Sequence, residues 1–198
     1  YEILRCLVGS EMCIRDRIIV VIMLSACSGS LDSQWVQTTD GTLFWASPAD
    51  TTMSYSWEGE TFDSIANGKG TLSKIDTVGN SLPQQFNMFY GATSDEDIVS
   101  MDDGSRYVGC TDGDMMEGFG VLDKGNELYI GSFHESKPNG YLKYFKNGKL
   151  FYDGYWKDGA FFGEGTLYKE DGSIKSGEWN NGTLVQLSLI HISEPTRH

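Results

Sequence analysis

Tyrosine and glycine recur at a fixed spacing along the second half of the chain. Tyr107, Tyr129 and Tyr152 each stand two residues before a glycine. The glycines of this series follow one another after 22, 23 and 23 residues: Gly109, Gly131, Gly154 and Gly177. A short unit repeated at a fixed period is typical of stacked modules. The sequence therefore predicts a tandem array rather than one enzymatic domain.

Further positions keep the same register and indicate strands. Two residues after each glycine stand Thr111, Phe133, Trp156 and Trp179; nine after it stand Gly118, Gly140 and Gly163; eleven after it stand Gly120, Leu142 and Gly165; thirteen after it stand Leu122, Tyr144 and Leu167. Within each block the positions differ by two residues, which places their side chains on one face of a strand. Each unit therefore predicts two short strands.

Turn signals separate these strands. They are the pairs Asp112-Gly113, Asp158-Gly159 and Asn181-Gly182 inside the units, and Lys124-Gly125, Asn147-Gly148 and Asp171-Gly172 between them. Asp-Gly and Asn-Gly supply the positive φ values of two-residue hairpin turns. The expected fold is an all-β antiparallel meander, in which each strand glycine leaves room for an aromatic ring of a neighbouring strand.

The segment 152–168 resembles the unit of the MORN (membrane occupation and recognition nexus) repeat family. A second match begins at Trp57-Glu58-Gly59, and the resemblance covers residues 55–186, with 73–106 either a degenerate repeat or an insertion. It implies an elongated single-layer antiparallel meander of β-hairpin repeats, and the unit from Tyr129 departs from the pattern at Leu142. The expected structural glycines are Gly59, Gly68, Gly70, Gly109, Gly118, Gly120, Gly131, Gly140, Gly154, Gly163, Gly165 and Gly177.

Both ends of the chain resemble translated sequencing-adapter DNA rather than protein of this fold. The two segments are residues 1–17 and 187–198, and we expect the gene to be truncated at both sides. They hold four basic and four acidic residues, so the net charge of −13 is unchanged without them. Outside these segments the chain has one histidine, His134, and two cysteines, Cys27 and Cys110.

The stretch before the array resembles a bacterial lipoprotein signal. An apolar run over 18–24 is shorter than a membrane span, and it ends in Leu24-Ser25-Ala26-Cys27, which resembles a lipobox with Cys27 as the lipid attachment residue. The expected signal peptide is 18–26. Residues 27–54 then form a tether and an N-terminal hairpin or cap. An ordinary secretory signal or a core strand remains open. Serine after the cysteine implies the outer membrane, if the source has two membranes.

Candidate chemistry is sparse, and no cofactor or metal is expected. His134 is interpreted as a solvated turn residue rather than part of a Ser-His-Asp group. Cys110 is interpreted as a half-buried strand residue rather than a catalytic thiol. The carboxylates at 95–97 and 102–103 lack the alternating spacing of a calcium loop, so a solvated loop is favoured.

Charge limits the partners. Residues 18–106 hold 3 basic and 12 acidic residues, and residues 107–186 hold 8 and 12. Because both halves are negative, we expect no nucleic acid and no binding of anionic lipid headgroups by the repeats. The membrane link is expected through an acylated Cys27 alone.

These patterns predict a lipid-anchored, non-enzymatic interaction scaffold of the bacterial cell envelope. Its partner is expected to be another envelope protein or a glycan, because aromatic side chains are enriched at binding patches. The candidate interaction residues are Tyr155, Phe161, Phe162 and Tyr168. The alternative is a targeting module of an envelope hydrolase whose catalytic domain is missing from this sequence.

Overall fold

The computed structural model describes residues 34–46 and 52–187, and within them the fold is all-β. Fourteen strands in this described part divide into a sheet of five and a sheet of nine. The smaller sheet contains β1 (Gln34–Gln37), β2 (Leu43–Ala46), β3 (Ser54–Phe62), β4 (Ile65–Ile75) and β5 (Ser81–Met88). The larger sheet contains β6 (Val99–Ser100), β7 (Arg106–Asp112), β8 (Met115–Asp123), β9 (Glu127–His134), β10 (Lys137–Lys146), β11 (Lys149–Lys157), β12 (Ala160–Tyr168), β13 (Ile174–Asn180) and β14 (Thr183–Leu187).

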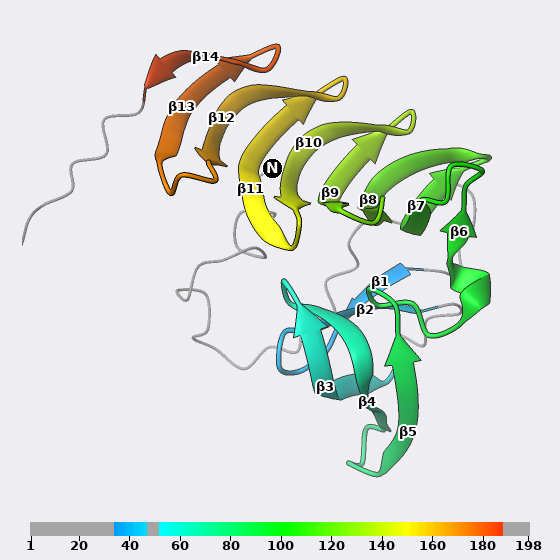
Figure 1. The fold of residues 1–198 in the computed structure, drawn as a ribbon. Coiled ribbons are helices and arrows are strands. Elements are labelled where there is room, and N and C mark those ends of the chain that lie inside the picture. The colour runs from blue at the N-terminus through cyan, green and yellow to red at the C-terminus, as the bar shows by residue number, and fades with distance from the viewer. Residues whose placement is uncertain (1–33, 47–51, 188–198) are drawn as a thin grey trace, which may run out of the picture.

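The nine-stranded sheet is the predicted hairpin meander. Its strands pair antiparallel in the order of the sequence from β6 to β14, so every connection is a hairpin (Figure 1). Unit glycines face one another in two of its hairpins, where Gly109 lies opposite Gly120 and Gly154 opposite Gly165. The repeat period thus corresponds to one hairpin of two strands.

The five-stranded sheet is less regular. Its order is β1-β2-β4-β3, and β5 pairs with the rest of β4. One parallel contact joins Leu43 to Ile65. The stretch 73–106 forms the end of β4, then β5, a single 3-10 turn (Asp95–Asp97) and β6.

The two sheets pack against each other, which a single elongated layer would not do. Trp35 is 1% exposed, its ring meets Phe119 edge to face at 5.4 Å, and its Nε1 donates a 3.1 Å hydrogen bond to the Phe119 carbonyl. The shared core also contains Trp45, Ile65, Val108, Val121, Ile130 and Phe145. Burial of these side chains stabilises the layered arrangement, and Figure 1 shows the smaller sheet beneath the larger one.

The hairpin turns confirm part of the turn prediction. Both residues of Asn147-Gly148, Asp158-Gly159 and Asn181-Gly182 have positive φ. The β7–β8 turn is displaced by one residue, to 113–114. Two further hairpin turns each hold two non-glycine residues at positive φ and were not predicted: Asp63 with Ser64, and Glu135 with Ser136. Such positions cost of order 1 kcal/mol each, which the flanking strand pairing must offset.

Several sequence predictions lie outside the described residues. They are the adapter-like ends apart from Leu187, the signal segment 18–26, and Cys27 with its tether. Among the described residues, no helix has the length and apolar character needed to cross a membrane.

Candidate interaction surface

Each regular unit of the array holds an aromatic ring against two glycines. The ring of Tyr152 in β11 lies against Gly154 of its own strand and Gly165 of β12. A methyl group at Gly165 would come within 2.5 Å of Tyr152 Cζ, so only glycine fits. The Tyr152 hydroxyl donates a 3.2 Å hydrogen bond to the Tyr155 carbonyl. Tyr152 is 0% exposed as a result.

The same arrangement recurs in two other units. Tyr107 lies against Gly109 and Gly120, and Trp57 lies against Gly59 and Gly70. In each case the polar atom of the ring donates to a carbonyl three residues on: the Tyr107 hydroxyl to Cys110 at 2.9 Å, and Trp57 Nε1 to Glu60 at 3.1 Å. The predicted stacking of rings on bare backbone is therefore present in both sheets.

The unit that departs from the pattern has a different interior. Leu142 stands where glycine is expected, faces Gly131 and is 0% exposed, so the leucine occupies the space of the ring. Tyr129 instead stacks on Tyr144, with ring centroids 4.6 Å apart and planes at 16°. Both hydroxyls donate to the Glu127 carboxylate, at 3.1 and 2.8 Å. With leucine in place of glycine at position 142, Tyr129 does not pack on the backbone and instead shares the Glu127 carboxylate with Tyr144.

The first glycine of each Gly-x-Gly pair, and Gly140 at the equivalent position before Leu142, has another role. These residues all have positive φ, namely 79°, 71°, 105° and 65°, at Gly68, Gly118, Gly140 and Gly163. In each hairpin the strand register shifts close to this residue. Positive φ at a bulge is cheap only for glycine. One glycine of the pair therefore bends the strand, and the other admits the ring.

Phe161 belongs to the interior of the repeats. Its ring stacks on Tyr152 at 3.8 Å and 7°, and it meets Trp156 and Trp179 edge to face. The Trp179 indole donates a 2.9 Å hydrogen bond to the Gly165 carbonyl. These contacts hold successive hairpins together, so Phe161 acts in repeat stacking.

The other three candidate aromatic residues, Tyr155, Phe162 and Tyr168, lie on the face of the sheet opposite Phe161. Tyr141 and Asp153 lie on that same face. Tyr155 pairs with Tyr141 across β10 and β11, with ring centroids 5.4 Å apart. The Tyr141 hydroxyl donates a hydrogen bond to the Asp153 carboxylate. Burial, and then Asp153, raise the pKa values of Tyr141 and Tyr168. We call Tyr141, Asp153, Tyr155 and Tyr168 the tyrosine cluster.

An ion pair and a cation-π contact border the tyrosine cluster. Lys143 Nζ lies 2.7 Å from the Asp63 carboxylate in the turn between β3 and β4, and both side chains are largely buried. This pair joins the two sheets beside the cluster. On the far side, Phe162 is 42% exposed and Lys157 lies over its ring at 5.3 Å.

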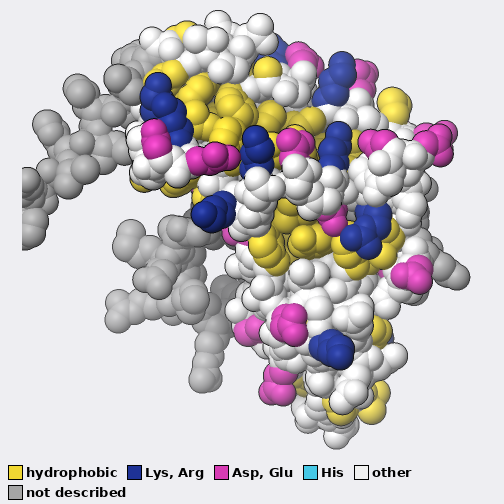
Figure 2. All heavy atoms as spheres, viewed as in Figure 1, with side chains coloured by type: hydrophobic (Ala, Val, Ile, Leu, Met, Phe, Trp, Pro, Cys, Tyr) yellow, Lys and Arg dark blue, Asp and Glu magenta, His cyan; other side chains and the backbone are white. Residues whose placement is uncertain are grey.

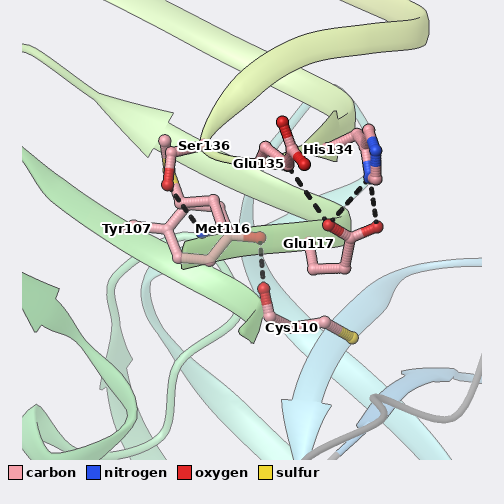
Figure 3. A network of polar contacts seen from close by, with 7 residues as sticks. All are labelled: Tyr107, Cys110, Met116, Glu117, His134, Glu135 and Ser136. Carbon is pink, nitrogen blue, oxygen red and sulfur yellow. Dashed lines mark hydrogen bonds and ion pairs between the residues drawn. The ribbon is translucent and has the colours of Figure 1, made fainter. Parts of the chain in front are cut away.

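His134 is exposed, as predicted, but it is the last residue of strand β9 rather than a turn residue. Its Nδ1 contacts the Glu117 carboxylate at 3.0 and 3.1 Å, and the Glu135 amide donates to the same carboxylate at 3.2 Å (Figure 3). The hydrogen bond to Glu117 raises the pKa of His134, and the same bond lowers the pKa of Glu117. Ser136 Oγ accepts a 3.0 Å bond from the Met116 amide. These contacts fasten the turn at positions 135 and 136.

Cys110 is buried in β7, at 3% exposure, and is disulfide-bonded. Its predicted place in a strand is confirmed, but the side chain is fully buried rather than half-buried, and the disulfide was not predicted. Cys6, Cys13 and Cys27 lie outside the described residues. A disulfide sulfur is not a thiolate nucleophile.

The loop carboxylates serve local turns. Asp97 accepts hydrogen bonds from Thr93 and Ser94, and Asp103 accepts one from the Ser105 amide. Hydrogen bonds from Ser105 lower the pKa of Asp103. Within the described part of the chain, no three His, Cys, Asp or Glu side chains are grouped so that they could hold a metal ion.

Figure 2 shows where apolar side chains reach the surface. Hydrophobic atoms gather along the nine-stranded sheet, bordered by Lys, Asp and Glu. The partly buried hydrophobic side chains of that sheet's second core include Tyr129, Phe151, Phe161, Leu167 and Leu184. The two faces of the array therefore differ: one is an aromatic repeat core, and the other becomes polar and tyrosine-rich beyond the smaller sheet.

Comparisons with known proteins add no family. No protein-family model matches the chain, and no curated protein matches it significantly.

Proposed function

We propose that this chain is a lipid-anchored, non-enzymatic MORN-type repeat protein of the bacterial cell envelope, which acts as an interaction scaffold for another envelope protein or a glycan. The supporting observation is that the interior positions of the array recur from unit to unit, whereas the outward positions vary. The ring and glycine positions of the stack recur from unit to unit. The residue that follows each repeat glycine points to the opposite face and changes from unit to unit, as Cys110, Ser132, Tyr155 and Glu178. A scaffold needs a constant interior and a variable surface.

Site-specific crosslinking would test this function. A photoreactive residue replaces Tyr168 in the chain expressed in a bacterial host from the complete gene, and the same residue replaces Phe161 as an interior control. The proposal expects a discrete crosslinked envelope component at position 168 and none at 161. Equal crosslinking at both positions, or none at 168, contradicts it.

The hydrolase alternative has its own outcome. If the complete gene encodes a catalytic domain beyond the repeats, and its product hydrolyses an envelope polymer, the chain is a targeting module. Loss of that hydrolysis on deletion of the repeats would then replace the scaffold proposal.

A further inference from the structure

One face of the nine-stranded sheet changes character where the five-stranded sheet ends. Over β7 to β9 this face carries buried side chains that pack on the smaller sheet, namely Val108, Cys110, Val121 and Ile130. On β10 to β12 the same face carries Tyr141, Asp153, Tyr155 and Tyr168. The covered part is apolar, and the part beyond it is amphipathic.

Cross-strand stability alone does not account for three tyrosines here. The neighbouring positions of this face carry the small polar or charged residues that are usual on a solvated sheet. The Thr166 and Ser176 hydroxyls share a 2.9 Å hydrogen bond, and Glu178 follows in β13. Tyrosine is instead suited to a surface that is wet at one time and covered at another, because it joins a broad apolar ring to a hydroxyl.

We propose that the tyrosine cluster binds a neutral glycan, with pyranose rings stacked on Tyr155 and Tyr168 and sugar hydroxyls donating to the Asp153 carboxylate. The C–H face of a pyranose is apolar, whereas its rim carries hydroxyl donors, and an ionised carboxylate is an acceptor only. The cluster offers rings and an acceptor side by side. This inference rests on the proposed scaffold function and names its ligand class.

Charge selects a neutral polymer over an anionic one. Asp153 and Glu164 lie on this face, and Lys143 beside them is held by Asp63 at 2.7 Å. A polyanion would face the Asp153 carboxylate at short range, where repulsion is only weakly screened. Uronic acid and phosphate polymers are therefore disfavoured.

A glycan also fits this face better than a protein partner does. Protein interfaces are built around an apolar core within a buried area of about 1,000 Å² or more. Among the described residues of β10 to β12, Phe162 is the large hydrophobic side chain that is exposed. Half-buried rings beside a carboxylate instead provide a narrow strip, which suits a single extended chain.

The test measures glycan binding by the full chain. Calorimetry would titrate it with cellohexaose, with chitohexaose and with an oligogalacturonate as the anionic probe. We expect at least one neutral probe to bind and the anionic probe not to bind. Tyr155→Ala and Tyr168→Ala should each lower the affinity for the neutral probe by about tenfold. Phe151→Ala removes a half-buried ring from the opposite face and should leave the affinity unchanged.

A second measurement protects the test against misfolded variants. Proton NMR of the wild-type chain should show ring-proton shifts of Tyr155 and Tyr168 on addition of the neutral probe, and no comparable shift of Phe151. The inference is overturned if neither neutral probe binds, if the oligogalacturonate binds as tightly, or if Phe151→Ala weakens binding equally. A protein crosslinked at Tyr168 in a chain that binds no glycan would overturn this inference and leave the scaffold function standing.

Discussion

The ring of Tyr152 fills the space that a side chain on Gly165 would need. The two residues lie on neighbouring strands, and a methyl group at Gly165 would come within 2.5 Å of the Tyr152 Cζ atom. Tyr107 and Gly120 repeat this relationship in an earlier unit. The stability of the array therefore depends on pairs of residues in adjacent strands rather than on glycine alone.

Gly165→Val should destabilise the array by about 3 kcal/mol, because the branched side chain must displace a fully buried tyrosine. Valine's gain in strand propensity, about 1 kcal/mol at most, does not offset this. Glu164→Val on the opposite face, where the side chain is exposed, is the control and should change the unfolding free energy much less. Denaturant melts of both variants measure the difference, and a Gly165→Val chain as stable as the parent would rule out the stacked ring.

Leu142→Gly should destabilise the protein although it restores the repeat pattern. Leu142 is fully buried, and its removal leaves a cavity in the aromatic core while adding backbone freedom. We expect a loss of about 3 to 5 kcal/mol. A thermal melt measures it. An increase in stability would show instead that Tyr129 moves into the vacated space and leaves Tyr144.

Alkaline pH should destabilise the protein between about pH 10 and pH 12, because Tyr129 keeps its proton in the folded state over a range in which the unfolded state releases it. Burial, followed by the charge of Glu127, raises the pKa of Tyr129 to about 12. A folded-state pKa above the unfolded one means that the stabilisation is complete below pH 10 and is lost as pH rises through 12. Tyr129→Phe should make this decline shallower in melts from pH 9 to 12. An unchanged pH dependence would contradict the assignment.

The pair of Glu117 and His134 should stabilise its hairpin end in a limited pH window. The raised pKa of His134 contributes stability that is present below its ordinary value of 6.5 and is lost as pH rises through the folded value. The lowered pKa of Glu117 contributes stability above its ordinary value of 4.5, which is lost as pH falls through the folded value.

NMR titration of the His134 ring measures this coupling. Glu117→Gln should lower the His134 pKa toward 6.5, and salt should reduce the shift in the parent, because both side chains are exposed. His134→Asn identifies the signal among the three histidines of the chain. A His134 pKa that is identical in Glu117→Gln would refute the pairing.

Cys27→Ala should abolish labelling of the protein by radioactive palmitate and release it from membranes. The physical reason is that two or three acyl chains on one residue anchor a protein stably, and we expect the acidic repeats to add no binding to anionic headgroups. The sulfur of Cys27 cannot carry both a lipid and a disulfide. Labelling that persists in the alanine variant, or a peptide in which Cys27 is bonded to Cys110, would contradict lipidation.

The sequence predicted much of the nine-stranded sheet because its information is local. Glycine and aromatic positions at 22 to 23 residues, with Asp-Gly and Asn-Gly turns, specify hairpins through short-range backbone preferences and pairing between neighbours. The roles of Gly165, Gly120 and Tyr152 follow from the same pattern. The hairpin turns at Asp63 and Glu135 escaped prediction because the strand ends, and not the turn residues, impose their positive φ.

The sequence by itself determined that the chain forms repeated antiparallel hairpins with rings against glycines, since each of these features depends on residues close together in one or two units. Tertiary structure decided what lies far apart in sequence. It set Trp35 against Phe119 and Lys143 against Asp63, and it separated Phe161 from Tyr155 and Tyr168 on opposite faces. Alternation along a strand defines two faces but not which of them another sheet will cover. That choice depends on the summed burial of distant side chains, which becomes fixed only when the sheets pack.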